Sequence, residues 1–277
     1  LIHSGDRWLD ESTTGTTHTV TGYGDLAIPA PTASTPHEAA MKRSAIRFDG
    51  SDDYLSIPYI AGGDFDILAD ASVDFTVELW VNSDVTLTGL SNDQVCFVST
   101  GGEGTAGNPN GWNLQIYQGG FQPTAVNGSA TGNNYTWGWS NQMLIKDSPI
   151  IAGAWTHYAW TRESGVFRGY ENGVLGFTVS DQTDYKVDIL DHELEIDRHV
   201  NGNRHLEGYI YDLRITKGVA KDPTAAGYLD NPIVTTKLTH PGGDDSGNKN
   251  HFDVENIGGH DIVGDSPSPG KNFCAFN

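Results

Sequence analysis

Apolar and polar side chains alternate along many short stretches of the chain, which is the pattern of a half-buried β-strand. The clearest stretch spans residues 209–215, where Tyr209, Tyr211, Leu213 and Ile215 are expected to share one face and Asp212 the opposite face. Further strands are predicted at 73–81, 95–100, 112–117, 154–162, 166–171, 174–179 and 194–196, with a hairpin at 41–57. The pattern therefore predicts a protein built from many short strands.

No stretch has a convincing 3.6-residue period, so the chain is expected to contain at most short helical turns. Two antiparallel sheets that pack face to face bury one face of every strand. The 277 residues suffice for one large all-β domain and an appendage. We expect a two-sheet antiparallel sandwich over residues 1–230 and an irregular, Gly- and Pro-rich C-terminal extension over 231–277, packed on the domain or on a neighbouring subunit.

The formal net charge of −20 narrows the range of partners. Affinity for nucleic acid comes largely from Lys and Arg against phosphate, so a nucleic-acid partner is not expected. Anionic membrane surfaces are disfavoured for the same reason, and no apolar run approaches the roughly 20 residues of a membrane helix. The charge instead favours solubility and the binding of cations.

Several motifs occur in a fixed order. They are Phe48-Asp-Gly-x-Asp-Asp-Tyr54, Phe75-Thr-Val-Glu-Leu-Trp80-Val81, Trp155-x-His-x-Ala-x-x-Arg162, Tyr170-Glu-Asn-Gly173 and Gly208-Tyr-Ile-Tyr-Asp-Leu-Arg-Ile215. Together they resemble the laminin-G-like, concanavalin A-like jelly roll, over roughly residues 1–227. The resemblance implies that Trp80, Trp155 and Trp160 lie in the core.

Two segments point to a more specific resemblance. The sequence Asp-Leu-Arg-Ile-Thr-Lys-Gly-Val-Ala at 212–220 resembles laminin-G-like modules of tailed-phage virion proteins, and residues 265–277 resemble a tail segment of phage structural proteins. This likeness implies a virion structural or adhesion protein, in a tail fibre, appendage or capsid decoration. It would be a homo-oligomer at the virion surface or outside cells, in contact with other virion subunits and host-surface glycan.

The resemblance to laminin-G-like domains implies a Ca²⁺ ion at the rim of the sheets. Asp49, Asp52 and Asp53 of the acidic turn, together with Asp212, are the implied ligands. Ca²⁺ takes six to eight oxygen ligands, which carboxylates and backbone carbonyls supply. For Asp212 a second interpretation is open, because Arg214 stands two residues along the same strand face and could form an ion pair with it.

A loop rich in Gly and Asn carries Tyr135, Trp137 and Trp139. Exposed aromatic rings stack on the C–H faces of sugars, so these residues are the predicted glycan site. Alternatively, the two tryptophans plug the core or contact another subunit.

Alternating carboxylates at Glu193, Glu195 and Asp197 resemble the Glu-x-Asp-x-x-Glu signature of family-16 glycoside hydrolases. The third acidic position is occupied by Val200, or by Arg198 in the other register, so no catalytic residue is assigned. A non-enzymatic, lectin-like adhesion module is therefore expected. The alternatives are a secreted or cell-surface carbohydrate-binding module and a polysaccharide-degrading enzyme.

Overall fold

The structure is a computed structural model. It describes residues 45–57, 65–90, 93–101, 110–127, 135–136, 143–180, 187, 192–225, 228–229 and 253–255. Within these ranges the regular elements are all strands, and no helix long and apolar enough to cross a membrane occurs among them.

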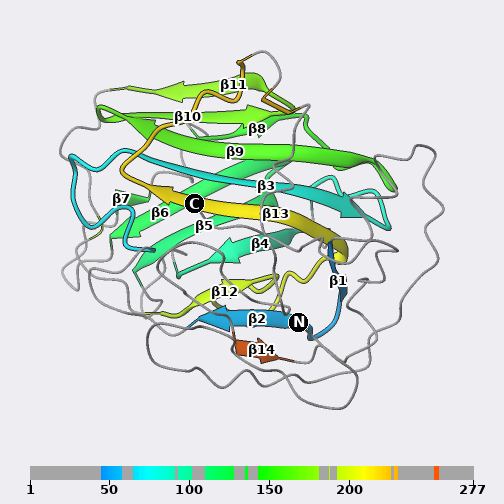
Figure 1. Cartoon of the computed structure of the whole chain (residues 1–277). Helices are drawn as coiled ribbons and strands as arrows, with labels where there is room; N and C mark the ends of the chain where they lie inside the picture. Colours follow the sequence, from blue (N-terminus) through cyan, green and yellow to red (C-terminus); the bar gives the residue numbers. More distant parts are fainter. Residues whose placement is uncertain are drawn as a thin grey trace, which may run out of the picture.

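In the described part of the chain, fourteen strands form two antiparallel sheets, which confirms the predicted all-β sandwich (Figure 1). The six-stranded sheet has the order β1 (Ile46–Asp49), β13 (Glu207–Lys217), β3 (Phe75–Ser83), β9 (Trp155–Glu163), β10 (Val166–Glu171), β11 (Val174–Val179). The eight-stranded sheet has the order β14 (Asp253–Glu255), β2 (Tyr54–Ile57), β12 (Leu194–Ile196), β4 (Val95–Ser99), β5 (Gly111–Tyr117), β6 (Gly120–Asn127), β7 (Tyr135–Thr136), and β8 (Ile145–Lys146) also pairs with β6.

Aromatic side chains fill the space between the two sheets. Trp160 of β9 packs edge-on against Phe75 of β3, with ring centroids 4.7 Å apart, and stacks on Phe167 of β10 at 5.7 Å. From the other sheet, Phe121 stacks on Tyr158 at 4.5 Å. Burial of such rings removes large apolar areas from water, and their offset and edge-to-face contacts add to the stability.

Strand β13 contains a bulge that changes which side chains face the core. Its register with β3 shifts between Tyr211 and Arg214, and Asp212 adopts a positive φ of 52°. Ile210, Leu213 and Ile215 consequently join the core, whereas Tyr209 and Tyr211 belong to a separate cluster on the outer face. The prediction of one uniform alternation over 209–215 was therefore wrong, because the extra residue of a bulge reverses the side-chain phase.

The outer face of the six-stranded sheet carries aromatic residues as well. Trp80 and Trp155 are partly buried there against Tyr209 and Tyr211, so of the three tryptophans expected in the core only Trp160 lies between the sheets. Further along the same face lies a segment made of residues 219–225 and 228–229, which we call the crossing segment. Thr76 anchors this crossing segment through hydrogen bonds to Val219 O (3.0 Å) and from Lys221 N (2.8 Å).

The C-terminal region contributes one strand to the sandwich. Asp253–Glu255 forms β14, which pairs with β2 at the edge of the eight-stranded sheet and is drawn in orange-red beside it in Figure 1. Part of the predicted extension thus lies on the domain, while the boundary at residue 230 stays a prediction.

Candidate functional site

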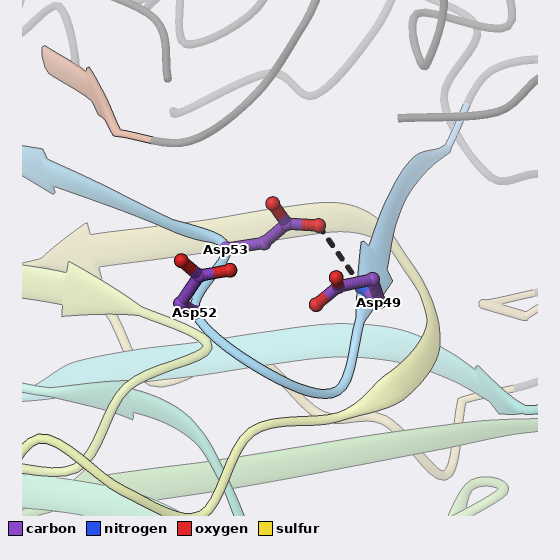
Figure 2. A group of neighbouring side chains, drawn as sticks. All are labelled: Asp49, Asp52 and Asp53. Atoms are coloured by element: carbon purple, nitrogen blue, oxygen red, sulfur yellow. Dashed lines mark hydrogen bonds between the residues drawn. The ribbon is translucent and has the colours of Figure 1, made fainter. Parts of the chain in front are cut away.

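The turn between β1 and β2 brings three carboxylates together. Asp49, Asp52 and Asp53 place one oxygen each within 4.8 Å of one another. In Figure 2 the Asp53 side chain reaches back to the start of the turn, where Asp49 N–H donates a 3.0 Å hydrogen bond to Asp53 Oδ2. Gly50 permits this close turn, because its φ is +82° and an added Cβ would lie 3.0 Å from Glu207 Cβ on the neighbouring strand.

This acidic turn (Asp49, Asp52 and Asp53) concentrates negative charge at a partly buried place. Burial, followed by the charge of Asp49, raises the pKa of Asp53 to about 7. Oxygens that bind one Ca²⁺ lie roughly 2.3–2.6 Å from the ion, so oxygens within about 5 Å of one another can share it. The three carboxylates therefore fit a calcium ion in both spacing and chemistry. No second group of three or more His, Cys, Asp or Glu side chains with such spacing occurs in the described ranges.

Asp212 lies apart from the acidic turn, in the bulge of β13. Its carboxylate accepts a 2.9 Å hydrogen bond from Arg214 Nε and forms an ion pair with the same guanidinium. Burial raises the pKa of Asp212 to about 6, against the opposing effect of Arg214. The structure thus shows the ion pair that was one of the two interpretations of this residue.

A second candidate surface covers the outer side of the eight-stranded sheet. Residues that alternate with core positions point away from the core there, and register pairs join them across five strands. We call this set the polar face; its members are Ser56 (β2), Glu195 (β12), Ser99 (β4), Asn113 and Gln115 (β5), and Gln122 and Thr124 (β6). All seven side chains are buried, so the outer side of this sheet is a hydrogen-bonding layer rather than a second apolar core.

Two arginines are bonded to the polar face, and the guanidinium group of each lies over a tyrosine ring. The Arg198 guanidinium carbon lies 4.5 Å from the centroid of the Tyr54 ring, and that of Arg204 lies 4.9 Å from Tyr117. Arg198 also donates to Glu195 Oε1, and Arg204 donates a 2.8 Å hydrogen bond to Gln115 Oε1. Stacking and hydrogen bonding fix the planar guanidinium groups, which lowers the entropy that they would lose on binding a ligand.

The stretch that resembles the glycoside hydrolase signature contains Glu193, Glu195 and Asp197, and its last two carboxylates lie in different surroundings from each other. Asp197, which follows β12 with φ +65°, is fully buried, accepts a 2.7 Å hydrogen bond from Leu206 N and lies 3.6 Å from His205 Nδ1. Burial raises its pKa to about 8, against the opposing effect of the neighbouring His205. Glu195 is the member of this stretch that belongs to the polar face, and burial raises its pKa as well.

The predicted glycan residues cannot be placed in the same way. Tyr135 begins β7, which pairs with β6, but its side chain and the residues Trp137 and Trp139 lie outside the described part of the chain.

The polar face was not predicted from the sequence, although the alternation of Asn113 and Gln115 with core residues was visible in β5. Its members are scattered over five strands, and only the sheet register brings them together.

A family model described as the concanavalin A-like lectin/glucanases superfamily matches residues 49–224. No curated protein matches the chain by sequence. Among solved structures, the chain is similar to the CBM40 of the Ruminococcus gnavus IT-sialidase, at 14% identity and a TM-score of 0.45, over 65% of this chain and 92% of that one.

Two further solved structures are similar to the chain. One is a leech intramolecular trans-sialidase, with 16% identity, a TM-score of 0.42, and coverage of 70% of this chain and 28% of that one. The other is domain 4 of an extracellular GH43 arabinanase from Geobacillus stearothermophilus, with 21% identity, a TM-score of 0.37, and coverage of 55% and 64%.

Proposed function

This chain belongs to the concanavalin A-like lectin/glucanases superfamily, and we propose that it is a non-enzymatic glycan-binding module whose polar face is the sugar-binding surface. The observation that carries the proposal is a pair of partly exposed arginines, Arg198 and Arg204, which donate hydrogen bonds to Glu195 and Gln115 of the polar face. Beneath them lies the layer of hydroxyl, amide and carboxylate groups across β2, β12, β4, β5 and β6. Sugars present many hydroxyl groups that both donate and accept hydrogen bonds, so a sheet face with both kinds of partner suits them.

The absence of catalysis is part of this proposal and rests on the carboxylates. Glycoside hydrolysis needs two carboxyl groups that reach the scissile bond from defined distances. Asp197 has no exposed surface, and its carboxylate is engaged by Leu206 N and neighbours His205. Only Glu195 of this stretch lies on the polar face.

The test is binding of the full chain to an array of polysaccharides and host-surface glycans, with release of reducing sugar measured in parallel. We expect retention on at least one glycan and no product release. Failure to bind any glycan would overturn the binding role, and product release that Glu195→Gln abolishes would establish the enzyme instead.

We further propose that the module acts in adhesion at a virion surface, in a homo-oligomer with other virion subunits. Support comes from the resemblance of residues 212–220 and 265–277 to phage structural proteins. Gold-labelled antibody against the chain, imaged on purified phage particles and on host cells, tests the location. Label on a fibre, appendage or capsid is the expected result. Label confined to cells or medium would favour a secreted or cell-surface carbohydrate-binding module.

Calcium binding at the acidic turn completes the proposal. Asp49, Asp52 and Asp53 would hold the ion, which would neutralise their mutual repulsion and fix the β1–β2 turn beside β13. Elemental analysis of the purified chain, combined with melting in the presence of chelator, tests this. Absence of metal together with an unchanged melting temperature would contradict it.

A further inference from the structure

Glu195 has one carboxylate oxygen that lacks a hydrogen-bond partner although its side chain has no exposed surface. Oε1 accepts from Arg198, while Oε2 is buried without a hydrogen bond. The His192 ring lies beside it, with Nδ1 3.8 Å from Oε2 and 3.0 Å from Glu193 O. A buried acceptor without a donor is costly, so this oxygen is a place where a ligand donor would gain free energy.

The pair formed by Glu195 and Arg198 offers both hydrogen-bonding roles side by side. The Oε2 atom can accept a hydrogen bond, and the guanidinium, which lies over the Tyr54 ring, can donate one. The side chains of Arg198 and His192 are 31% and 23% exposed, so they form the accessible layer above the buried carboxylate.

We infer that the Glu195–Arg198 pair recognises two neighbouring hydroxyl groups of an uncharged sugar, and this inference rests on the proposed glycan-binding function. One hydroxyl donates to Glu195 Oε2, and the adjacent hydroxyl accepts from Arg198. Each hydroxyl can play both roles, so a vicinal diol satisfies both groups at once.

Anionic sugars fit the same pair poorly. An ionised carboxylate or a sulfate brings acceptors only, so it leaves Oε2 without a donor and competes with Glu195 for Arg198. The neighbouring Glu193 and the net charge of −20 add repulsion. We therefore expect neutral glycans to be preferred over uronate-containing, sialylated and sulfated ones.

The test compares matched polysaccharides that differ in charge alone, such as a neutral galactan and its sulfated form, together with neutral mannans and glucans and the acidic polymers alginate and polygalacturonate. The full chain should bind a neutral polymer at least about tenfold more tightly than acidic ones, which corresponds to about 1.4 kcal/mol. Neutral binding should change little between low and high salt, because no net ligand charge is screened.

Two variants connect the preference to the pair. Glu195→Gln should weaken the binding of neutral polymers by about tenfold or more, because the charged acceptor is lost. It should also reduce the difference in affinity between neutral and anionic polymers, because Arg198 no longer has a competing carboxylate. Arg198→Lys, which alters a partly exposed side chain, should weaken neutral binding even if Glu195→Gln fails to fold. The matched control is Glu163→Gln, which removes the carboxylate of an exposed Glu–Arg pair on the other sheet (3.0 Å to Arg168) and should leave binding unchanged.

The possible results distinguish a failure of the Glu195–Arg198 inference from a failure of the proposed glycan-binding function. Salt-sensitive binding that favours acidic polymers would overturn the inference and leave the glycan-binding function standing. Neutral binding that survives both Glu195→Gln and Arg198→Lys in folded protein would also overturn it. Binding to no glycan at all would overturn the proposed function and the inference together.

Discussion

Glu78 joins the six-stranded sheet to the segment that crosses its outer face. Its carboxylate accepts hydrogen bonds from Tyr228 Oη (2.6 Å) and Lys221 Nζ (3.1 Å), and His157 Nε2 lies 3.4 Å away. Burial alone would raise the pKa of Glu78, but the hydrogen bond with His157 and the charge of Lys221 lower it to about 2. The folded state therefore stabilises the ionised form of this carboxylate.

Replacement of Glu78 by Gln should destabilise the protein by about 3 kcal/mol, because it leaves buried cationic groups without their counter-charge. Chemical denaturation at neutral pH measures the change. Glu163→Gln removes a comparable carboxylate from an exposed pair and should cost about 0–1 kcal/mol. Equal effects of the two substitutions would show that the buried network contributes nothing beyond a surface ion pair.

The pH dependence of this difference follows from the lowered pKa. A carboxyl whose pKa falls from 4.5 to about 2 on folding contributes stability that is fully present above pH 4.5. That contribution is lost as the pH falls through about 2. The stability gap between wild type and Glu78→Gln should consequently shrink between pH 4.5 and 2, and a gap that stays constant would contradict the assignment.

Asp53 makes stability depend on pH in the opposite direction to Glu78. Its pKa rises from 3.8 to about 7 on folding, so its contribution to stability is present below pH 3.8 and is lost as the pH rises through about 7. Calcium competes with that proton. We expect Ca²⁺ at a hundredfold excess over Kd to raise Tm by about 5–10 °C at pH 8 and by much less at pH 5.

Calorimetry with calcium or chelator at the two pH values measures this effect. Asp53→Asn should abolish the calcium-dependent shift, whereas Asp222→Asn, at an exposed carboxylate bonded to Thr224, should retain it. Identical melting of the wild type with calcium and with chelator at pH 8 would rule out an ion that stabilises the acidic turn.

At the scale of single elements, the positions of the strands were predictable from the sequence, but the face of the sheet on which each side chain lies was not. Alternation located β13 correctly, because the apolar content of residues 209–215 determines that the stretch is a buried strand. The bulge at Asp212 depends on a left-handed backbone conformation that no local pattern reveals, whereas its ion pair with Arg214 was one of the two interpretations of the sequence. The same limit applies to Trp80 and Trp155, whose apolar character suits a core as well as a covered outer face.

The hairpin between β10 and β11 depends on Gly173, which has φ +75° and lies under the crossing segment. A Cβ there would lie 2.9 Å from Pro223 O and 3.2 Å from Leu229 Cδ1. Gly173→Ala should therefore cost about 2 kcal/mol or more, from backbone strain and from displacement of the crossing segment.

Gly153→Ala is the matched control for this hairpin. Its φ is +77°, but nothing lies within 4 Å of the added Cβ, so it should carry only the backbone cost of about 1 kcal/mol. Urea denaturation of both variants measures the difference. If the two variants were equally stable, the contact of the hairpin with Pro223 and Leu229 would contribute nothing to the free energy of unfolding.

At the scale of the whole molecule, the two sheets have different outer faces. The six-stranded sheet is covered by an ionic and aromatic layer, whereas the eight-stranded sheet carries the polar face. Asp49, Asp52 and Asp53 were predictable as a group because they are neighbours in the sequence. The polar face was not, because Ser56 and Glu195 meet only through the pairing of β2 with β12. Sites assembled by long-range register are beyond local pattern analysis.

The C-terminal region affects the edge of the eight-stranded sheet, and a pair of truncations isolates its contribution. Removal of residues 257–277 keeps β14, whereas removal of 231–277 deletes it and leaves β2 as the edge strand. The longer truncation should lose about 1–2 kcal/mol relative to the shorter one, through lost β14–β2 hydrogen bonds, and melt about 3–6 °C lower. An unpaired edge also templates pairing between chains, so we expect concentration-dependent association of this truncation by light scattering. Equal melting temperatures and the same number of chains per particle for the two truncations would show that β14 neither stabilises the sheet nor protects its edge.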